Sequence, residues 1–301
     1  MGMNIGIITV RGPHYHPNRR LREAAAEKGH RVILVHPYHV WPGLEHGKLG
    51  LVGLPDLASL DVVLPRQGAT VGDSCLALIR HFSLMGIPVV NNLNSIRLTK
   101  NKFLTLQALV KAHIPVLHTV FVNSAKGFQE ALTRLGGFPV VIKQVSSRQG
   151  EGIILIEENC NVQSVTQKYL DRRKGLLVQR FIPTEGRHDI RVFVVGTNIV
   201  GAMELHPMKG DFRANYHLSK ASKPTDLTPE LKRISLKAAN AVGLEIAGVD
   251  IMVDKNDQAT VIEVNYSPGF KGLEAATGFD IANRIVGYVV DTYGEKSHAE
   301  E

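Results

Sequence analysis

The sequence predicts an α/β protein that becomes α+β in its later part. Three observations support this fold class. Strand and helix patterns alternate through residues 1–95, short strands and helices mix through residues 96–184, and strands dominate residues 185–301. Alternating strands and helices favour a parallel sheet that is covered on both faces. We therefore expect an N-terminal α/β domain at 1–95 and two α+β subdomains at 96–184 and 185–301.

In the first segment, the helix patterns end at glycines, which are normal helix stops. Leu21, Ala24 and Ala25 share one face of the first helix, which stops at Gly29, and Gly86 stops the second. The expected elements are a strand at 4–10, a helix at 18–28, strands at 31–36 and 61–65, a helix at 73–85 and a strand at 87–90.

The pattern changes after residue 95. The second segment predicts helix 101–112, strand 116–122, helix 124–135, strands 138–143 and 153–157, helix 162–170 and strand 176–182, and Ser124 is a plausible N-cap. The third predicts strands 190–195, 199–205, 246–253 and 259–265, with helices at 229–242 and 279–293.

The composition excludes several classes of protein. With 301 residues, 44% hydrophobic and 21% charged, the chain fits an ordinary globular protein. It has no apolar run long enough to cross a bilayer and no export signal at its N-terminus. Cys75 and Cys160 are isolated, as expected of free thiols in a reducing compartment. We expect a cytoplasmic protein without a membrane partner.

The chain is basic, with a net charge of +7 and a pI of about 9.4. Such a charge permits an acidic partner. The basic residues are spread along the chain without a basic stripe interleaved with aromatic residues. Direct binding of nucleic acid is therefore not favoured.

A hairpin near the C-terminus carries paired carboxylates. If the polar turn at 254–258 centres between Asn256 and Asp257, Asp250 faces Glu263 across the two strands. Like charges that face each other destabilise a sheet, and Asn265 shares the Glu263 face. This oxygen-only set suits Mg²⁺. The alternative is a register slipped by one, with one carboxylate solvated at a sheet edge.

A glycine loop follows a lysine at the end of a strand. Lys143 ends the strand, and Gln149, Gly150 and Gly152 follow before the next one. Small residues let backbone N–H groups approach anionic oxygens, and the lysine adds a point charge. An ordinary flexible hairpin is the alternative.

Two further segments carry arginines. Asp189 and Arg191 lie close together, and Arg213 and Asn215 share one face if their segment is extended. Arginine is suited to bidentate contact with phosphate or carboxylate. Because an unpaired buried charge is costly, Asp189, Arg191 and Arg213 form either a structural ion network or an anion site.

The ordered series of these motifs resembles an ATP-grasp carboxylate–amine ligase, and more narrowly the RimK family of α-L-glutamate ligases. The motifs are short, but their order and spacing are specific and the resemblance covers nearly the whole chain. They are Lys102, Lys143, the glycine loop, Gln179 to Ile182, Asp189-Ile190-Arg191, Phe212-Arg213-Ala214-Asn215, Gly248-Val249-Asp250 and the segment from Glu263 to Gly269.

The resemblance implies an ATP-grasp fold, in which two α+β subdomains clasp ATP, and a role for each motif residue. Lys102, Lys143 and the glycine loop with Gln149, Gly150 and Gly152 correspond to contacts with the phosphates. Gln179, Arg180, Phe181 and Ile182 correspond to the adenine hinge, and Asp189 to a ribose or nucleotide contact. Arg191, Arg213 and Asn215 correspond to residues around the transferred phosphoryl and acyl groups, and Arg213 and Asn215 also to nucleotide contacts. Asp250, Glu263 and Asn265 correspond to the ligands of Mg²⁺, for which Mn²⁺ is the alternative.

The chain departs from the family pattern at three places. Arg180 stands where an acidic hinge residue is usual, the segment 217–222 lacks a common glycine pair, and Lys271 stands where glutamate is common. The last two lie where contacts with the acceptor are expected, so they bear on acceptor identity.

The resemblance also implies the activity and the partners. ATP would activate a carboxylate as an acyl phosphate, and glutamate would be added to the C-terminus of a protein or peptide acceptor, acidic or ribosomal. A small-molecule acceptor, or a nucleotide-binding regulatory protein without ligation, are the alternatives. A homo-oligomer, either a dimer or a tetramer, is expected on the same ground.

Overall fold

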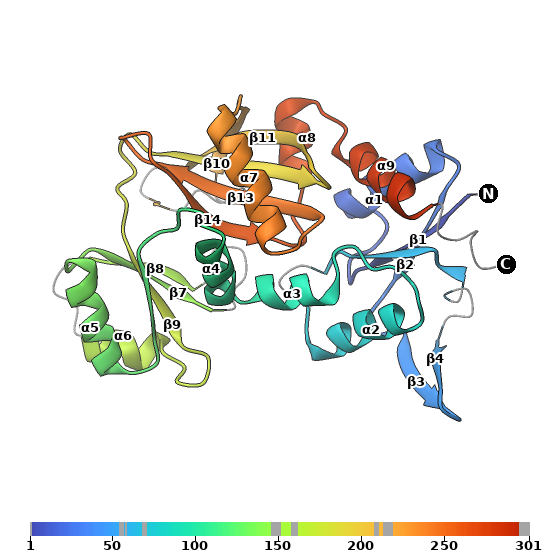
Figure 1. The fold of residues 1–301 in the computed structure, drawn as a ribbon, viewed down its shortest axis with the longest axis horizontal. Helices are drawn as coiled ribbons and strands as arrows, with labels where there is room; N and C mark the ends of the chain where they lie inside the picture. The colour runs from blue at the N-terminus through green and yellow to red at the C-terminus, as the bar shows by residue number, and fades with distance from the viewer. Residues whose placement is uncertain are drawn as a thin grey trace.

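The computed structural model describes residues 2–53, 57, 59–67, 71–145, 152–157, 162–207, 211–212 and 219–294, of which 219–222 are described by their backbone only. Its three larger sheets occupy different parts of an elongated molecule (Figure 1). The N-terminal sheet lies at one end, a four-stranded sheet lies at the other, and a five-stranded sheet lies along one side between them.

The N-terminal sheet is parallel, as predicted. Its order is β2 (Arg31–Val35), β1 (Asn4–Ile8) and β5 (Val62–Pro65). The central strand β1 is almost fully buried, as expected when both faces of a parallel sheet are covered. Helices α1 (His16–Glu27) and α2 (Asp73–Leu84) belong to this region, and the predicted glycine stops are confirmed because Gly29 and Gly86 adopt φ of 77° and 82°.

The four-stranded sheet is antiparallel, in the order β6 (Thr119–Val122), β9 (Leu176–Arg180), β7 (Val140–Gln144) and β8 (Ile153–Ile156). Helices α5 (Ala125–Leu135) and α6 (Val162–Tyr169) pack together on it. Ser124 accepts a hydrogen bond from the backbone N–H of Gly127, which confirms the predicted N-cap.

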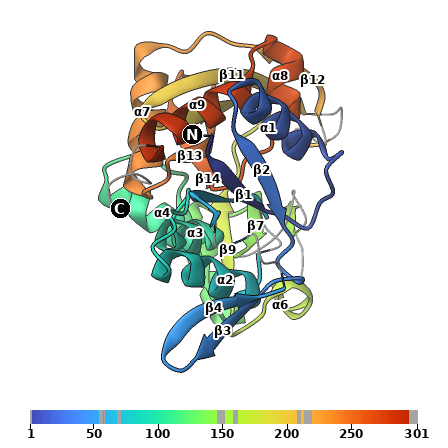
Figure 2. The ribbon, with the colours of Figure 1, turned by 90° about the vertical axis from the view of Figure 1, so that its right-hand side faces the viewer.

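The five-stranded sheet is antiparallel and covered on both faces. Its order is β12 (Ser219–Pro224), β11 (Asn198–Pro207), β10 (His188–Val195), β13 (Ile246–Val253) and β14 (Ala259–Asn265). Alternation along β10 sends Val192 and Val194 into one core with helix α7 (Pro229–Ala241). Phe193 and Val195 enter a second core with α8 (Lys271–Thr277) and α9 (Ile281–Tyr293). Helix α9 also packs on α1, so the end of the described chain lies beside its beginning (Figure 2).

Several elements differ from the prediction. The strand predicted at 87–90 is only an isolated bridge between Val63 and Val89, because the segment turns away into helix α3 (Leu93–Lys100). That helix, α8 and β12 were not predicted, while the predicted helix at 101–112 is α4 (Lys102–Lys111).

A hairpin of β3 (Trp41–Glu45) and β4 (Lys48–Val52) was also missed. Its strands contain proline and glycine and bury few side chains, so they lack an alternating apolar pattern. The part of the sequence that could have indicated this hairpin is its turn. There His46 and Gly47 both take positive φ, as a type I′ turn requires. Across the described ranges, we find no helix with the length and apolar character needed to span a membrane.

Candidate functional site

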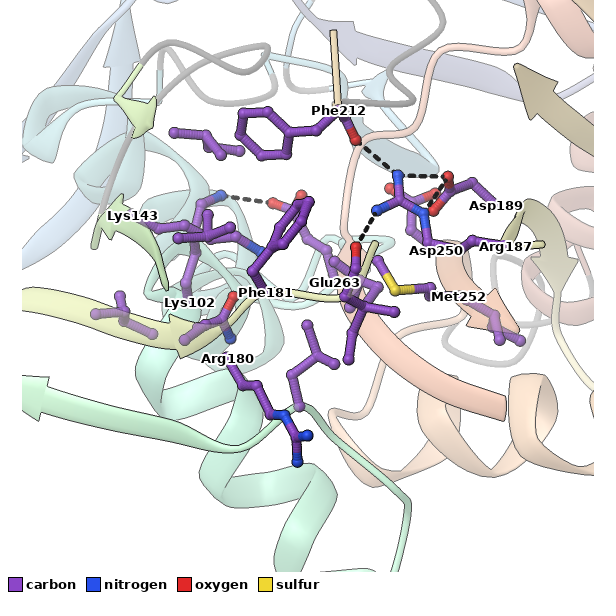
Figure 3. Close-up of a pocket in the computed structure, with 18 of the residues that line it drawn as sticks. Lys102, Lys143, Arg180, Phe181, Arg187, Asp189, Phe212, Asp250, Met252 and Glu263 are labelled. Carbon is purple, nitrogen blue, oxygen red and sulfur yellow. Dashed lines mark hydrogen bonds and ion pairs between the residues drawn. The ribbon is translucent and has the colours of Figure 1, made fainter. Parts of the chain in front are cut away.

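A cavity of about 110 Å³ lies between the four-stranded and five-stranded sheets (Figure 3). Strands β7, β8 and β9 form one wall, strands β10, β13 and β14 form the other, and α4 contributes Lys102 and Leu106. Nine of the predicted site residues line it: Lys102, Lys143, Gln179, Arg180, Phe181, Ile182, Asp189, Asp250 and Glu263. Residues that are far apart in the sequence therefore meet at one cavity.

The predicted pairing of Asp250 with Glu263 is confirmed, but the assumed uniform register is wrong. Asp250 faces Glu263, whereas Ile251 faces Val261 because a β-bulge shifts the register by one between these pairs. The bulge leaves Ile262 as the extra residue, and both Ile262 and Glu263 line the cavity. Bulges commonly re-aim side chains beside functional sites.

Both carboxylates of this hairpin have cationic partners. Arg191 binds Asp250 through two hydrogen bonds, Nε to Oδ1 and Nη2 to Oδ2, each of 2.7 Å. Asn265 Nδ2 lies 3.3 Å from Asp250 Oδ2, and Lys102 Nζ lies 2.7 Å from Glu263 Oε1. Arg191 and Asn265 do not line the cavity but hold the Asp250 carboxylate that does.

The surroundings shift the pKa values of two cavity residues, Lys143 and Glu263. Burial lowers the pKa of Lys143 to about 8, although the Glu263 carboxylate opposes this shift. Burial would raise the pKa of Glu263, but the positive charges of Lys102, Lys143 and Arg191 together outweigh it and leave this pKa below its usual value. Lys143 forms no ion pair with an acidic side chain of the described chain, so it is a partly buried cation available to an anionic ligand.

Arg187 is a site residue that the sequence analysis missed. Its side chain is 4% exposed, and its guanidinium binds Asp189 Oδ2 at 2.9–3.0 Å. It also donates to the backbone carbonyls of Ile182 at 3.0 Å and Phe212 at 2.6 Å (Figure 3). Burial raises the pKa of Asp189 although Arg187 opposes this. Arg187, Asp189 and Arg191 are spaced two residues apart, so continuing this spacing back beyond the start of β10 at His188 would have pointed to Arg187.

The hinge residues form an apolar wall with one free acceptor. Gln179 is 2% exposed, and its Nε2 donates to Thr119 Oγ1 at 2.7 Å. Its Oε1 is buried without a hydrogen-bond partner among the residues that the structure covers. The Arg180 side chain points away from the cavity, while its backbone N–H binds the carbonyl of His118 at 3.0 Å (Figure 3).

The remaining predicted residues are not placed at the cavity. Gly152 has a φ of 73° and closes the β7–β8 hairpin opposite Gln144, but it does not line the cavity. Gln149, Gly150, Arg213 and Asn215 lie outside the described residues. Their roles stay predictions.

The charges of the cavity region favour an anionic ligand. Four cations, Lys102, Lys143, Arg187 and Arg191, meet three carboxylates, Asp189, Asp250 and Glu263. The described residues contain no group of three or more His, Cys, Asp or Glu side chains that could hold a metal alone. A cation at Asp250, Glu263 and Asn265 would therefore need further oxygen ligands, which a bound phosphate supplies.

Comparisons with known proteins agree with this geometry. Residues 3–96 match the RimK PreATP-grasp domain, and residues 99–289 match the RimK-like ATP-grasp domain. A probable alpha-L-glutamate ligase of Thioalkalivibrio sulfidiphilus is 35% identical over 289 residues, and one of Coxiella burnetii is 36% identical over 290 residues. In both cases the match covers 95% of each chain.

Solved structures show the same fold. A RimK domain ATP-grasp protein of Sphaerobacter thermophilus has a TM-score of 0.75 at 23% identity, covering 95% of this chain and 98% of that one. The ATP-grasp ligase PsnB, complexed with its minimal precursor, Mg and ADP, has a TM-score of 0.72 at 18% identity, with 96% and 97% covered. The predicted ATP-grasp fold is confirmed, and the chain belongs to the RimK family of ATP-grasp ligases.

Proposed function

We propose that this protein uses Mg²⁺–ATP to join a carboxylate to an amine, adding glutamate to the C-terminal carboxylate of a protein or peptide. The observation that carries the proposal is the cavity itself. It combines an apolar wall, an excess of cations and a facing pair of carboxylates in a protein of this family. A nucleoside triphosphate has the complementary parts, namely a flat base and a chain of phosphates that binds a metal.

The residues present fit both ligands. Gln179 Oε1 is a buried acceptor without a described partner, which suits a donor on the base, and Lys143 is a partly buried cation that suits a phosphate. Asp250, Glu263 and Asn265 offer only oxygen ligands on the facing strands, the donor type that Mg²⁺ prefers, and Mn²⁺ would find the same donors. When bound, the metal would neutralise charge on the phosphate oxygens.

The reaction would proceed in two steps. An oxygen of the acceptor carboxylate attacks the γ-phosphorus, and the bond from this phosphorus to the β-phosphate oxygen breaks. ADP departs, and the acceptor is left as an acyl phosphate. The amine then attacks the acyl carbon, loses a proton and releases phosphate. Lys143 and Lys102 would stabilise the transferring group electrostatically, while Arg191 would hold Asp250 in place.

The identities of the substrates rest on the relatives. The two relatives described above are named probable alpha-L-glutamate ligases, and PsnB was solved with a peptide precursor. These names support glutamate as the amine substrate and a peptide or protein as the acceptor. The net charge of +7 suits an acidic acceptor. We also propose that the protein is cytoplasmic and forms a homo-oligomer.

Measuring ADP release from Mg²⁺–ATP across a panel of amino acids, with and without acidic peptides, tests the proposal. We expect ADP release that requires both an amino acid and an acceptor, and an acceptor mass increased by one residue. Nucleotide binding without donor-dependent ADP release under any condition would favour the regulatory alternative. Ligation to a small molecule alone would exclude the protein or peptide acceptor.

Replacing Lys143 tests the phosphate contact. We expect Lys143→Ala to weaken ATP binding about 10- to 100-fold, because a hydrogen bond to a charged group is worth about 1.5–3 kcal/mol. Calorimetric titration with a non-hydrolysable ATP analogue measures the effect. Lys111→Ala, which removes an exposed lysine at the end of α4, is the control. Equal affinities for the wild type and Lys143→Ala would refute this contact.

Replacing Arg180 tests whether its departure from the family pattern matters. Because its side chain is exposed and points away from the cavity, Arg180→Glu is expected to change ATP affinity less than about threefold. The same calorimetric titration checks this. A tenfold change would show that the Arg180 side chain does reach the nucleotide.

A further inference from the structure

A second candidate site lies at the carboxyl ends of β1 and β5 in the N-terminal sheet. The chain leaves β1 for β2 on one side and later returns to β5 on the other side of β1. The strand order therefore reverses between β1 and β5. In open α/β sheets, ligands bind outside the carboxyl ends of the strands at such a switch point.

Hydrogen bonds fix the backbone at this edge. The N–H of Arg66 donates to the carbonyl of Ile8 at 2.8 Å, and the N–H of Val10 donates to Gln67 Oε1 at 2.9 Å. Asn18 Nδ2 donates to the carbonyls of Arg11 at 2.9 Å and Gly12 at 3.0 Å. The segments after both strands are thus held in place by β5 and α1, which gives Arg66 a defined position.

Arg66 is a largely enclosed cation without a counterion among the residues that the structure describes. Its Nη2 donates to the carbonyl of Pro268, and its guanidinium lies 5.8 Å from the centre of the Phe270 ring. Its Nε is buried and has no hydrogen-bond partner, and the described residues offer it no ion pair. Burial lowers the pKa of Arg66 only to about 10, so it stays charged at neutral pH. An enclosed charge without a counterion costs free energy unless an anion binds and neutralises it.

Two more cations lie on segments that adjoin this end of the sheet. Arg11 lies over the Tyr15 ring at 5.7 Å, and Lys271 directly follows Phe270. Both are exposed and form no ion pair with a described acidic side chain. Nearby Arg20, by contrast, pairs with Glu23, Glu274 and Asp280, which ties α1 to α8. Among the described residues, Arg11 and Lys271 therefore have no acidic partner.

This edge adjoins the proposed metal ligands. Pro268, which binds Arg66, follows Asn265 by three residues, and Gly248 pairs with Asn265 on the neighbouring strand. A Cβ built on Gly248 would lie 2.8 Å from Pro268 Cβ, so the Pro268 segment packs directly on β13. Arg66 is consequently placed beside the site where the carboxylate would be activated, yet it belongs to a different sheet.

We propose that Arg66 binds a substrate carboxylate other than the one that is activated, with Arg11 and Lys271 adding positive charge around it. This inference rests on the proposed ligase function and assigns a substrate contact to the N-terminal sheet. The carboxylate belongs either to the incoming amino acid or to the acceptor peptide, and the two sources are distinguishable. Arginine suits this role because its fork matches a carboxylate bidentately.

The test compares Arg66→Gln, Arg66→Lys and Arg80→Gln with the wild type. Arg80 is an exposed arginine on α2 and serves as the control for loss of one positive charge. We expect Arg66→Gln to raise the KM of the amino acid or of the acceptor about 10- to 100-fold, the range of one or two charged hydrogen bonds. The KM of ATP should stay within threefold, and thermal unfolding checks that the variant is folded. Arg66→Lys keeps the charge but not the fork, so it should show a smaller rise and remains informative if Arg66→Gln does not fold.

Titrating the two substrates separately identifies the source of the carboxylate. A raised KM for the amino acid alone, or for the acceptor alone, supports the proposal and assigns the carboxylate. Unchanged KM values for both substrates in a folded Arg66→Gln protein would overturn it while leaving the ligase function intact. If the wild type shows no turnover, calorimetric titration with L-glutamate and with an acidic peptide, each in the presence of Mg²⁺ and a non-hydrolysable ATP analogue, still tests the site. Binding that Arg66→Gln loses then supports the site although the ligase function fails, and equal binding by both proteins overturns it.

Discussion

Replacing Glu263 with glutamine is expected to lower kcat at least about 10³-fold with little loss of stability. Glutamine keeps the size and one acceptor oxygen of Glu263 but removes the charge that would hold the metal. The ion pair with Lys102 is partly solvated, with side-chain exposures of 16% for Lys102 and 34% for Glu263, so its loss should cost about 1 kcal/mol or less. Steady-state ADP release and thermal unfolding measure the two effects separately.

Glu204→Gln is the matched control for this experiment. Glu204 lies on β11 of the same sheet, pairs with the exposed His188 and does not line the cavity. The control should keep full activity. Wild-type activity in Glu263→Gln would exclude Glu263 from the metal site, and an equal loss in Glu204→Gln would show that the effect is not local.

Replacing Asp250 with asparagine is expected to abolish turnover and also to destabilise the protein by about 3 kcal/mol, because both members of the Arg191–Asp250 pair are mostly buried, at 17% and 18% side-chain exposure, and the guanidinium loses its carboxylate. The double variant Asp250→Asn/Arg191→Gln should recover much of this stability, since it removes both charges together. It should remain inactive, because the carboxylate is still absent. Urea unfolding of both single variants and of the double variant forms a double-mutant cycle that gives the coupling energy.

The cycle separates structural and catalytic roles at one residue. Additive effects of the two substitutions would show that the Arg191–Asp250 contact contributes no coupling energy. Activity in the double variant would remove Asp250 from the proposed metal set.

The sequence predicts the parts of the site that follow from local patterns. The facing of Asp250 and Glu263 follows from alternation and a polar turn, and it is correct at the site. The bulge at Ile262 was not predicted, because uniform alternation was assumed, whereas the buried Val261 and Val264 of β14 are three positions apart. Arg187 was missed because it lies just before β10, which begins at His188, whereas the predicted strand began only at residue 190.

Contacts between distant segments have no local signal. Lys102 reaches Glu263 across 161 positions of the sequence, and Arg66 reaches Pro268 across 202. The first was expected only through the family resemblance, which places both residues near the phosphates. The second was not expected, because neither the position of α8 beside α1 nor the packing of Pro268 on β13 can be inferred from strand and helix periodicity.

The central claim is that a carboxylate is activated by phosphoryl transfer before the amine attacks. Its most direct test uses an acceptor whose reacting carboxylate carries ¹⁸O at both oxygens, incubated with Mg²⁺–ATP and L-glutamate. An acyl phosphate transfers one carboxylate oxygen to phosphate, so we expect one ¹⁸O in the released phosphate for each amide bond and each ADP formed. Amide formation with unlabelled phosphate, or with AMP and pyrophosphate as products, would contradict the account.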